Sequence, residues 1–188
     1  MKIAGIYSFN KGREVIEHNF PELLNEIKDI ITSIDASKYK TKKSKEKTMR
    51  GRMLYSPVKL NKAFKAQFKK KKWSTVRVKC DYATSCYVEG YKNQETRGAF
   101  REMDFIKDEL GVELQFGKYA FMVYNVCAKM TIFNKLKHIK FGIEIVPIKE
   151  LAESMSTGVS YFEQFVWDLD HRGVSNIDIP VLIYGIGA

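Results

Sequence analysis

The fold is decided by two short apolar runs, Met103-Asp104-Phe105-Ile106 and Val112-Glu113-Leu114-Gln115-Phe116. Both have the length of short strands, and the residues between them, Lys107–Glu109, predict a turn. Residues two apart on a strand share a face, so Glu113 and Gln115 point the same way while their apolar neighbours enter the core. We therefore expect a hairpin that carries polar side chains on one face.

Such a hairpin can bring Asp104 beside Glu113 and Gln115. Two carboxylates that converge on one point, with a strand carbonyl nearby, form a hard oxygen site suited to Mg²⁺. An ion held there can activate water and neutralise charge on a phosphodiester. The same spacing is also typical of a solvated strand edge, so the pattern by itself leaves both interpretations open.

The rest of the chain predicts one domain of the α/β class that spans residues 1–188. The spacing of apolar residues predicts one helix that opens at Pro21 and a second from Leu60 to about Lys70. Trp73–Tyr91 predicts paired strands, and after Arg101 strands alternate with helices. No internal repeat or Pro- and Gly-rich linker interrupts this pattern.

Cysteine and histidine usage argues against two classes of protein. Three cysteines without Cys-x-x-Cys spacing fit neither a disulfide framework nor a zinc knuckle. The three histidines are scattered and do not have metal-ligand spacing. No run approaches the roughly 18 apolar residues of a membrane span, and the first residues have no signal-peptide pattern. We expect a cytoplasmic protein without a membrane partner.

Charge is distributed unevenly along the chain. Residues 1–79 contain 21 Lys and Arg against 7 Asp and Glu, whereas residues 80–188 contain 11 against 15. Lys38–Arg52 contains eight basic residues and predicts a basic loop or an exposed helix. A basic half favours a polyanionic partner, and nucleic acid is the first candidate. A lysine-rich surface that serves only solubility is the alternative.

The segment from Met103 to Phe121 resembles the active-site strands of type II restriction endonucleases of the BglII and BstYI group, within the PD-(D/E)xK nuclease superfamily. The similarity is weakest over residues 74–99, and we expect it to be closest to the BstYI branch. Further matching stretches are Ser33-Ile-Asp-Ala, Ser44-Lys-Glu-Lys-Thr, Leu54-Tyr-Ser-Pro-Val, Gly142-Ile-Glu-Ile-Val-Pro, Lys149-Glu-Leu and Ser156-Thr-Gly-Val-Ser-Tyr-Phe-Glu. The resemblance implies a restriction-endonuclease-like core, in which helices flank a central mixed β-sheet.

The resemblance also implies roles for the residues of the hairpin. Asp104 and Glu113 match the family's ligands for a catalytic Mg²⁺. Gln115 falls where most of the superfamily has lysine, a departure that the BglII branch shares. Glutamine cannot act as a cation or a general base, so we expect Gln115 to orient the attacking water by hydrogen bonds.

Three further positions match elements that contact DNA in this family. Lys118 follows the catalytic strand, where its donors can reach guanine O6 and N7. Ser156 and Thr157 lie in a small polar loop, and their hydroxyls both donate and accept hydrogen bonds. Without the resemblance, Lys118 is an ordinary surface lysine and the loop an ordinary helix cap. Lys129, on the helix after the active site, is a candidate for a phosphate contact.

The function that the resemblance implies is Mg²⁺-dependent cleavage of double-stranded DNA by a type II restriction endonuclease. We expect a GATC-centred palindrome, purine-GATC-pyrimidine, cut with 5′ overhangs. A palindrome and one active site per chain imply a homodimer. A cognate DNA methyltransferase is expected in the same system, without a stable complex. The alternatives are a repair-type or nicking nuclease of the same fold, and a DNA-binding protein without enzymatic activity.

Overall fold

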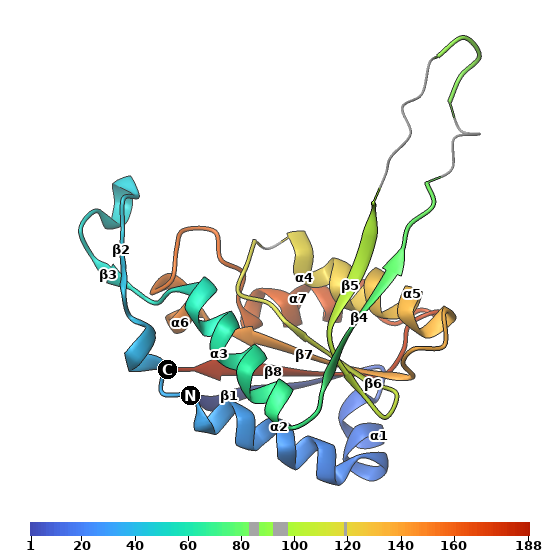
Figure 1. Ribbon diagram of the computed structural model, residues 1–188, viewed down its shortest axis with the longest axis horizontal. Helices are drawn as coiled ribbons and strands as arrows, with labels where there is room; N and C mark the ends of the chain where they lie inside the picture. Colours follow the sequence, from blue (N-terminus) through green and yellow to red (C-terminus); the bar gives the residue numbers. More distant parts are fainter. Residues whose placement is uncertain (83–86, 92–97, 119) are drawn as a thin grey trace.

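The computed structural model describes residues 1–82, 87–91, 98–118 and 120–188. Over these residues the centre of the molecule is a six-stranded sheet in the order β1-β8-β7-β6-β5-β4 (Figure 1). The strands are β1 (Lys2–Phe9), β4 (Ser74–Lys79), β5 (Phe100–Lys107), β6 (Leu110–Leu114), β7 (Phe141–Pro147) and β8 (Val181–Gly187). β6, β7 and β8 run parallel, while β1, β4 and β5 pair antiparallel with their neighbours. The sheet is therefore mixed, as expected from the sequence.

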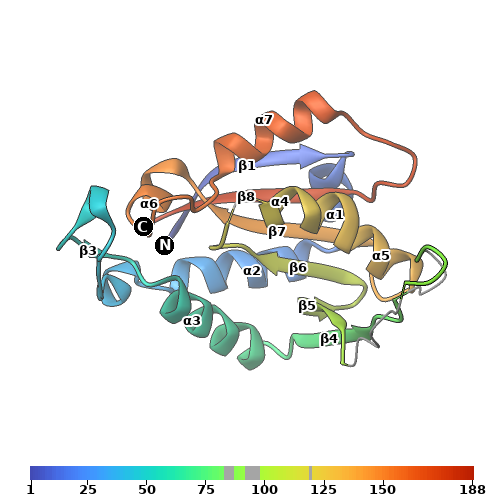
Figure 2. The same cartoon turned by 90° about the horizontal axis from the view of Figure 1, so that it is seen from above.

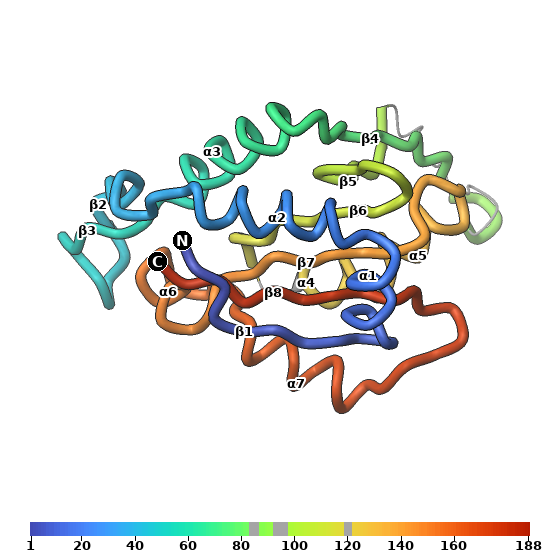
Figure 3. Tube along the Cα trace, turned by 90° about the horizontal axis from the view of Figure 1, so that it is seen from below, coloured from blue at the N-terminus to red at the C-terminus, as the bar shows by residue number. Residues whose placement is uncertain are grey.

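Helices cover both faces of this sheet (Figures 2 and 3). On one face, α2 (Pro21–Ser33) and α3 (Pro57–Lys70) pack on the apolar side chains of β6 and β7. The other face is covered by α4 (Ala120–Tyr124), a π-helical turn (Asn125–Lys129), α5 (Met130–Lys135) and α7 (Phe162–Arg172). The shorter helices are α1 (Gly12–Asn19) and α6 (Lys149–Glu153). Over the described residues, no helix combines the length and the apolar character needed to cross a membrane.

The two helices expected in the first half are confirmed, because each presents a continuous apolar stripe to the sheet. In α2, Ile27 and Ile31 are fully buried, and in α3 the same is true of Phe64 and Phe68. α3 begins earlier than the spacing suggested, at Pro57. Ser56 caps its first turn by accepting a hydrogen bond from the Lys59 amide at 3.4 Å.

The basic segment is neither an open loop nor a regular helix. It contains the short strand β2 (Lys42–Lys43) and a 3₁₀ turn at Lys47–Met49, and β2 pairs with β3 (Met53–Leu54), which directly follows the segment. The segment projects from one end of the molecule (Figure 1). It is anchored by the buried side chain of Leu54 and by the backbone hydrogen bond from Ser44 to Arg52. These anchors explain why a run of lysines is ordered here.

The prediction of paired strands within Trp73–Tyr91 is wrong in its pairing. Among the described residues of this segment, Ser74–Lys79 alone forms a strand, and it pairs with β5. The pairing of β4 with β5 joins residues that lie far apart in the sequence, such as Val76 and Met103. Residues 83–86, which include Cys86, lie outside the described residues.

Candidate active site and DNA-reading loop

The two acids of the hairpin lie side by side at the middle of the sheet. β5 and β6 pair with Phe105 opposite Val112, and the turn between them uses positive φ angles at Asp108 (48°) and Glu109 (66°). The Asp104 amide donates to Glu113 Oε1 at 3.4 Å, and the Leu114 amide donates to Asp104 Oδ2 at 3.2 Å. Each strand thus fixes the carboxylate of the other.

Burial makes these two carboxylates unusual. Glu113 is only 3% exposed. Burial, followed by the negative charge of Asp104, raises the pKa of Glu113 to about 8, while Lys129 opposes the shift. Burial also raises the pKa of Asp104. The site therefore places two acids close together in surroundings of low polarity, where a nearby cation favours their ionised forms.

A third acid, Glu144, lies next to Glu113 on the neighbouring parallel strand. It is fully buried, and burial followed by the charge of Glu113 raises its pKa well above the usual range. Its Oε1 accepts from Asn125 Nδ2 at 3.1 Å, and its Oε2 has no hydrogen-bond partner in the described part of the chain. Neither Glu144 nor Asn125 was assigned a role from the sequence. The available signal was an acid inside an otherwise apolar strand.

Lys129 supplies a positive charge to this group of acids. Its Nζ lies 2.7 Å from Glu113 Oε2, and its side chain is 13% exposed. Lys129 is the last residue of the π-helical turn, a feature that often occurs at functional sites. The sequence placed Lys129 on a helix as a phosphate contact, and the structure places it among the acids.

Asp104, Glu113 and Lys129 line a cavity, and helix α3 forms one of its walls. The cavity is lined by residues of β5 and β6, by Lys129 and by Asn61, Lys62 and Lys65 of α3. The charge of Lys65 opposes the rise in the pKa of Asp104. Asn61 Oδ1 is buried and has no hydrogen-bond partner among the described residues. These α3 residues were not singled out from the sequence, because the helix had been assigned only to packing.

The donor set fits a divalent cation. Within the described part of the chain, no group of three or more His, Cys, Asp and Glu side chains has an arrangement that could hold a metal ion. Mg²⁺ commonly takes only one or two carboxylates from the protein and completes its shell with water and phosphate oxygens. Asp104 and Glu113 meet that requirement, because a divalent cation between them would favour the ionised form of both acids.

Of the residues expected to read bases, Lys118 follows β6 and bridges to the loop that contains Ser156 and Thr157. Lys118 is exposed and forms an isolated antiparallel bridge with Val159. Ser160 reinforces the bridge, because its amide and hydroxyl donate to the Gly117 carbonyl at 3.2 and 3.0 Å. Gln115 Nε2 donates to the Lys118 carbonyl at 3.3 Å. These contacts thus connect the end of β6 and Lys118 to the loop at residues 156–159.

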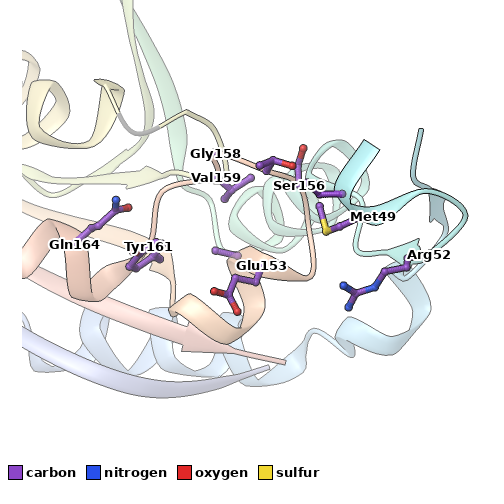
Figure 4. A pocket seen from close by; sticks show the side chains of 11 residues that line it. Met49, Arg52, Glu153, Ser156, Gly158, Val159, Tyr161 and Gln164 are labelled. Atoms are coloured by element: carbon purple, nitrogen blue, oxygen red, sulfur yellow. The ribbon is translucent and has the colours of Figure 1, made fainter. Parts of the chain in front are cut away.

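The loop faces the basic segment across a second cavity (Figure 4). Met49 and Arg52 form one side of this cavity, and Ser156, Tyr161 and Gln164 form the other. The two sides come from segments about a hundred residues apart in the sequence, and their contact was not expected from it.

Comparisons with known proteins identify the family and the fold of the chain. A family model described as restriction endonuclease BglII/BglIII matches residues 4–186. The crystal structure of BglII complexed with a DNA 16-mer superposes with a TM-score of 0.74 at 22% identity, over 100% of this chain and 79% of that chain. Free BglII gives a TM-score of 0.65 at 21% identity, over 100% and 80%. No curated protein sequence matches the chain.

The two structural likenesses show a shared fold, and the family match covers nearly the whole chain. The restriction-endonuclease core expected from the sequence is confirmed, whereas a closest similarity to BstYI stays a prediction. The chain belongs to the BglII/BglIII restriction endonuclease family, and its activity is that of a type II site-specific deoxyribonuclease.

Proposed function

We propose that this protein is a Mg²⁺-dependent homodimer that cuts double-stranded DNA at a GATC-centred palindrome, purine-GATC-pyrimidine, and leaves 5′ overhangs. The observation that carries the proposal is the convergence of Asp104 and Glu113 in one cavity with Lys129, next to the exposed Lys118 and the 156–158 loop. DNA as the partner is supported by BglII, whose structure is of a complex with a DNA 16-mer.

Asp104 and Glu113 are the proposed ligands of Mg²⁺. When bound, the ion supplies Lewis acidity and charge neutralisation at the scissile phosphate. The strand amides hold the two carboxylates in place before DNA arrives, so little reorganisation is needed during the reaction. Glu144 and Asn125 fill the space behind Glu113 and restrict its movement.

Gln115 and Lys129 have complementary roles in this proposal. Gln115 lines the cavity, and its amide orients the attacking water. Lys129 keeps a positive charge beside Glu113, where it stabilises the additional negative charge of the transition state. Lys62 and Lys65, on the opposite wall, bind the DNA backbone near the cut.

Base recognition is proposed for Lys118, Ser156 and Thr157. Lys118 is suited to guanine, because its ammonium donates to both O6 and N7. The bridge from Lys118 to Val159 couples this residue to the loop, and the strand before it carries the catalytic acid. Correct base contacts and correct placement of the phosphate therefore depend on the same backbone.

The homodimer is proposed from symmetry. A palindrome presents two identical half-sites related by a two-fold axis, and one protomer holds one pair of catalytic acids. We further propose that a DNA methyltransferase belongs to the same system without forming a stable complex, and that the enzyme works in the cytoplasm, where its DNA substrate is found.

Plasmid digestion tests the proposal. Purified protein should convert supercoiled plasmid to linear fragments with Mg²⁺ and not with EDTA, and sequencing of the ends should give GATC with 5′ overhangs. Sedimentation equilibrium should give twice the chain mass. Nicked circles as the final product would indicate a nicking nuclease, and cleavage at random positions a repair-type nuclease. Binding without cleavage under all divalent ions would contradict the metal site.

A further inference from the structure

Glu46 is the only acid in the basic segment Lys38–Arg52, and its carboxylate contacts the proposed base-reading loop. Its two oxygens accept hydrogen bonds from the Ser156 hydroxyl and from the Thr157 hydroxyl. The Thr157 amide donates to Glu46 Oε2 at 2.8 Å. One side chain therefore engages both hydroxyls of the loop at once.

Lys42, on β2 of the same basic segment, strengthens the contact of Glu46 with the loop. Its Nζ lies 3.6 Å from Glu46 Oε1 and donates to the Met155 carbonyl at 3.3 Å. Hydrogen bonds from Ser156 and then Thr157 lower the pKa of Glu46 to about 2. The carboxylate is therefore ionised at any pH at which the enzyme would meet DNA.

The chemistry of this contact fixes the polarity of the two hydroxyls. A hydroxyl has one proton to donate and two lone pairs to accept with, whereas an ionised carboxylate only accepts. Ser156 and Thr157 must each give their single proton to Glu46. What remains for any other partner is their lone pairs, so both act toward DNA as acceptors only.

Acceptors distinguish the bases in the major groove. Adenine presents an N6 amino group and cytosine an N4 amino group, while guanine O6 and thymine O4 are themselves acceptors. We propose that Glu46 makes the Ser156–Thr157 loop selective for the amino groups at adenine N6 or cytosine N4. Guanine and thymine are disfavoured there, because their keto oxygens can only accept hydrogen bonds. This inference rests on the proposed role of the loop in base reading, and it makes Glu46 a positioning residue for specificity.

The test compares cleavage of oligonucleotides in which one amino group has been removed. 2-Aminopurine replaces each adenine in turn, and 2-pyrimidinone replaces each cytosine, so the amino group leaves the major groove. The wild-type enzyme should lose roughly tenfold to a hundredfold in cleavage rate at the position that the loop contacts. Further duplexes carry guanine for adenine or thymine for cytosine at that position.

Glu46→Gln is the decisive variant. The glutamine side chain has one accepting oxygen, and its other terminal atom is a donating NH2 group, so one hydroxyl of the loop loses its acceptor and is free to donate its proton to a base. The penalty at the contacted position should fall to within a few-fold, and the keto bases should be tolerated there, while affinity for random DNA changes little. Glu153→Gln is the matched control, because Glu153 is an acid that lines the cavity beside Ser156 and Thr157, and this variant should keep the wild-type penalty.

The outcomes separate this inference from the role of the loop itself. If Ser156→Ala and Thr157→Ala remove the penalty but Glu46→Gln keeps it, the loop reads bases without help from Glu46 and the inference fails. If the alanine variants keep the penalty at every position, the loop does not read bases, and the proposed recognition fails with it. Equal slowing of Glu46→Gln on all duplexes would show a role in folding alone and would also overturn the inference.

Discussion

The ammonium of Lys129 lies 2.7 Å from the carboxylate of Glu113, although the two residues come from different layers of the fold. Glu113 belongs to a central strand, and Lys129 reaches it from the π-helical turn that covers that strand. Gln115, on the same strand as Glu113, is a neutral side chain and supplies no charge there. The π-helical turn therefore provides a cation to Glu113, the proposed catalytic acid.

Removal of this cation should slow the reaction. Lys129→Met is expected to reduce the single-turnover cleavage rate by roughly a hundredfold or more, which is typical when one transition-state-stabilising donor is lost. Lys129→Arg should retain part of the activity, since the charge is kept. Lys135→Met, an exposed position on α5, is the control and should cleave normally. Wild-type rates for Lys129→Met would show that the contact with Glu113 is only structural.

Removal of either acid should abolish cleavage without loss of DNA binding. Asp104→Ala and Glu113→Ala delete the proposed metal ligands and also remove negative charge that faces phosphate, so affinity should stay equal or increase. Rates come from plasmid cleavage with Mg²⁺, and affinities from gel shifts with EDTA. A thermal melt confirms that each variant folds. Near wild-type cleavage by either variant would mean that the metal site has been misassigned.

The basic segment should contribute affinity rather than sequence selectivity. Replacing Lys43, Lys45 and Lys47 by glutamine leaves the contact between Lys42 and Glu46 in place. Binding should weaken equally on cognate and random DNA, and the salt dependence should flatten by roughly one unit per lost phosphate contact. Fluorescence anisotropy over a range of salt concentrations measures both effects. A changed sequence preference would instead assign base reading to this segment.

Lys118 should matter more for recognition than for chemistry. Lys118→Ala is expected to reduce discrimination at a guanine-bearing position by roughly tenfold to a hundredfold, the usual range for loss of one base contact. Thr157→Ala should have a milder effect, because Ser156 can compensate. Cleavage is measured on duplexes that differ at one base pair each, at fixed salt and Mg²⁺. A uniform decrease on every duplex would indicate a backbone contact or a folding defect.

Asp178 should make the stability of the protein depend on pH. Its carboxylate accepts hydrogen bonds from Arg172 at 2.6 and 3.2 Å and from the Ser175 amide at 2.8 Å. Burial raises the pKa of Asp178, but the Arg172 and Ser175 hydrogen bonds outweigh burial and lower the pKa overall. The ionised form therefore stabilises the folded state above the ordinary pKa of 3.8, and this contribution is lost as the pH falls below it.

Asp178→Asn should accordingly reduce the free energy of unfolding at neutral pH by about 2 kcal/mol, the usual value of hydrogen bonds to a charged group. The difference from the wild type should shrink as the pH is lowered toward 3. Urea unfolding at several pH values measures both. If the difference in the free energy of unfolding between Asp178→Asn and the wild type does not vary with pH, the ionised form of Asp178 is not what stabilises the folded state.

The sequence by itself determined the parts of the protein that depend on neighbours along the chain. The two-residue period of β6 fixed which side chains enter the core, and the turn at residues 107–109 was enough to place Asp104 beside Glu113. The apolar spacing of α2 and α3 was likewise readable, because helix faces are defined within a few turns.

Only the tertiary structure decided which distant segments meet. Glu144 joins the acids because β7 pairs in parallel with β6 in one particular register, and Lys129 joins them because a π-helical turn aims its side chain at that strand. Glu46 reaches Thr157 across 111 residues of sequence. Local patterns fix the periodicity of each element. Strand order and loop contacts depend on the packing of the whole chain, which a pattern of neighbouring residues does not determine.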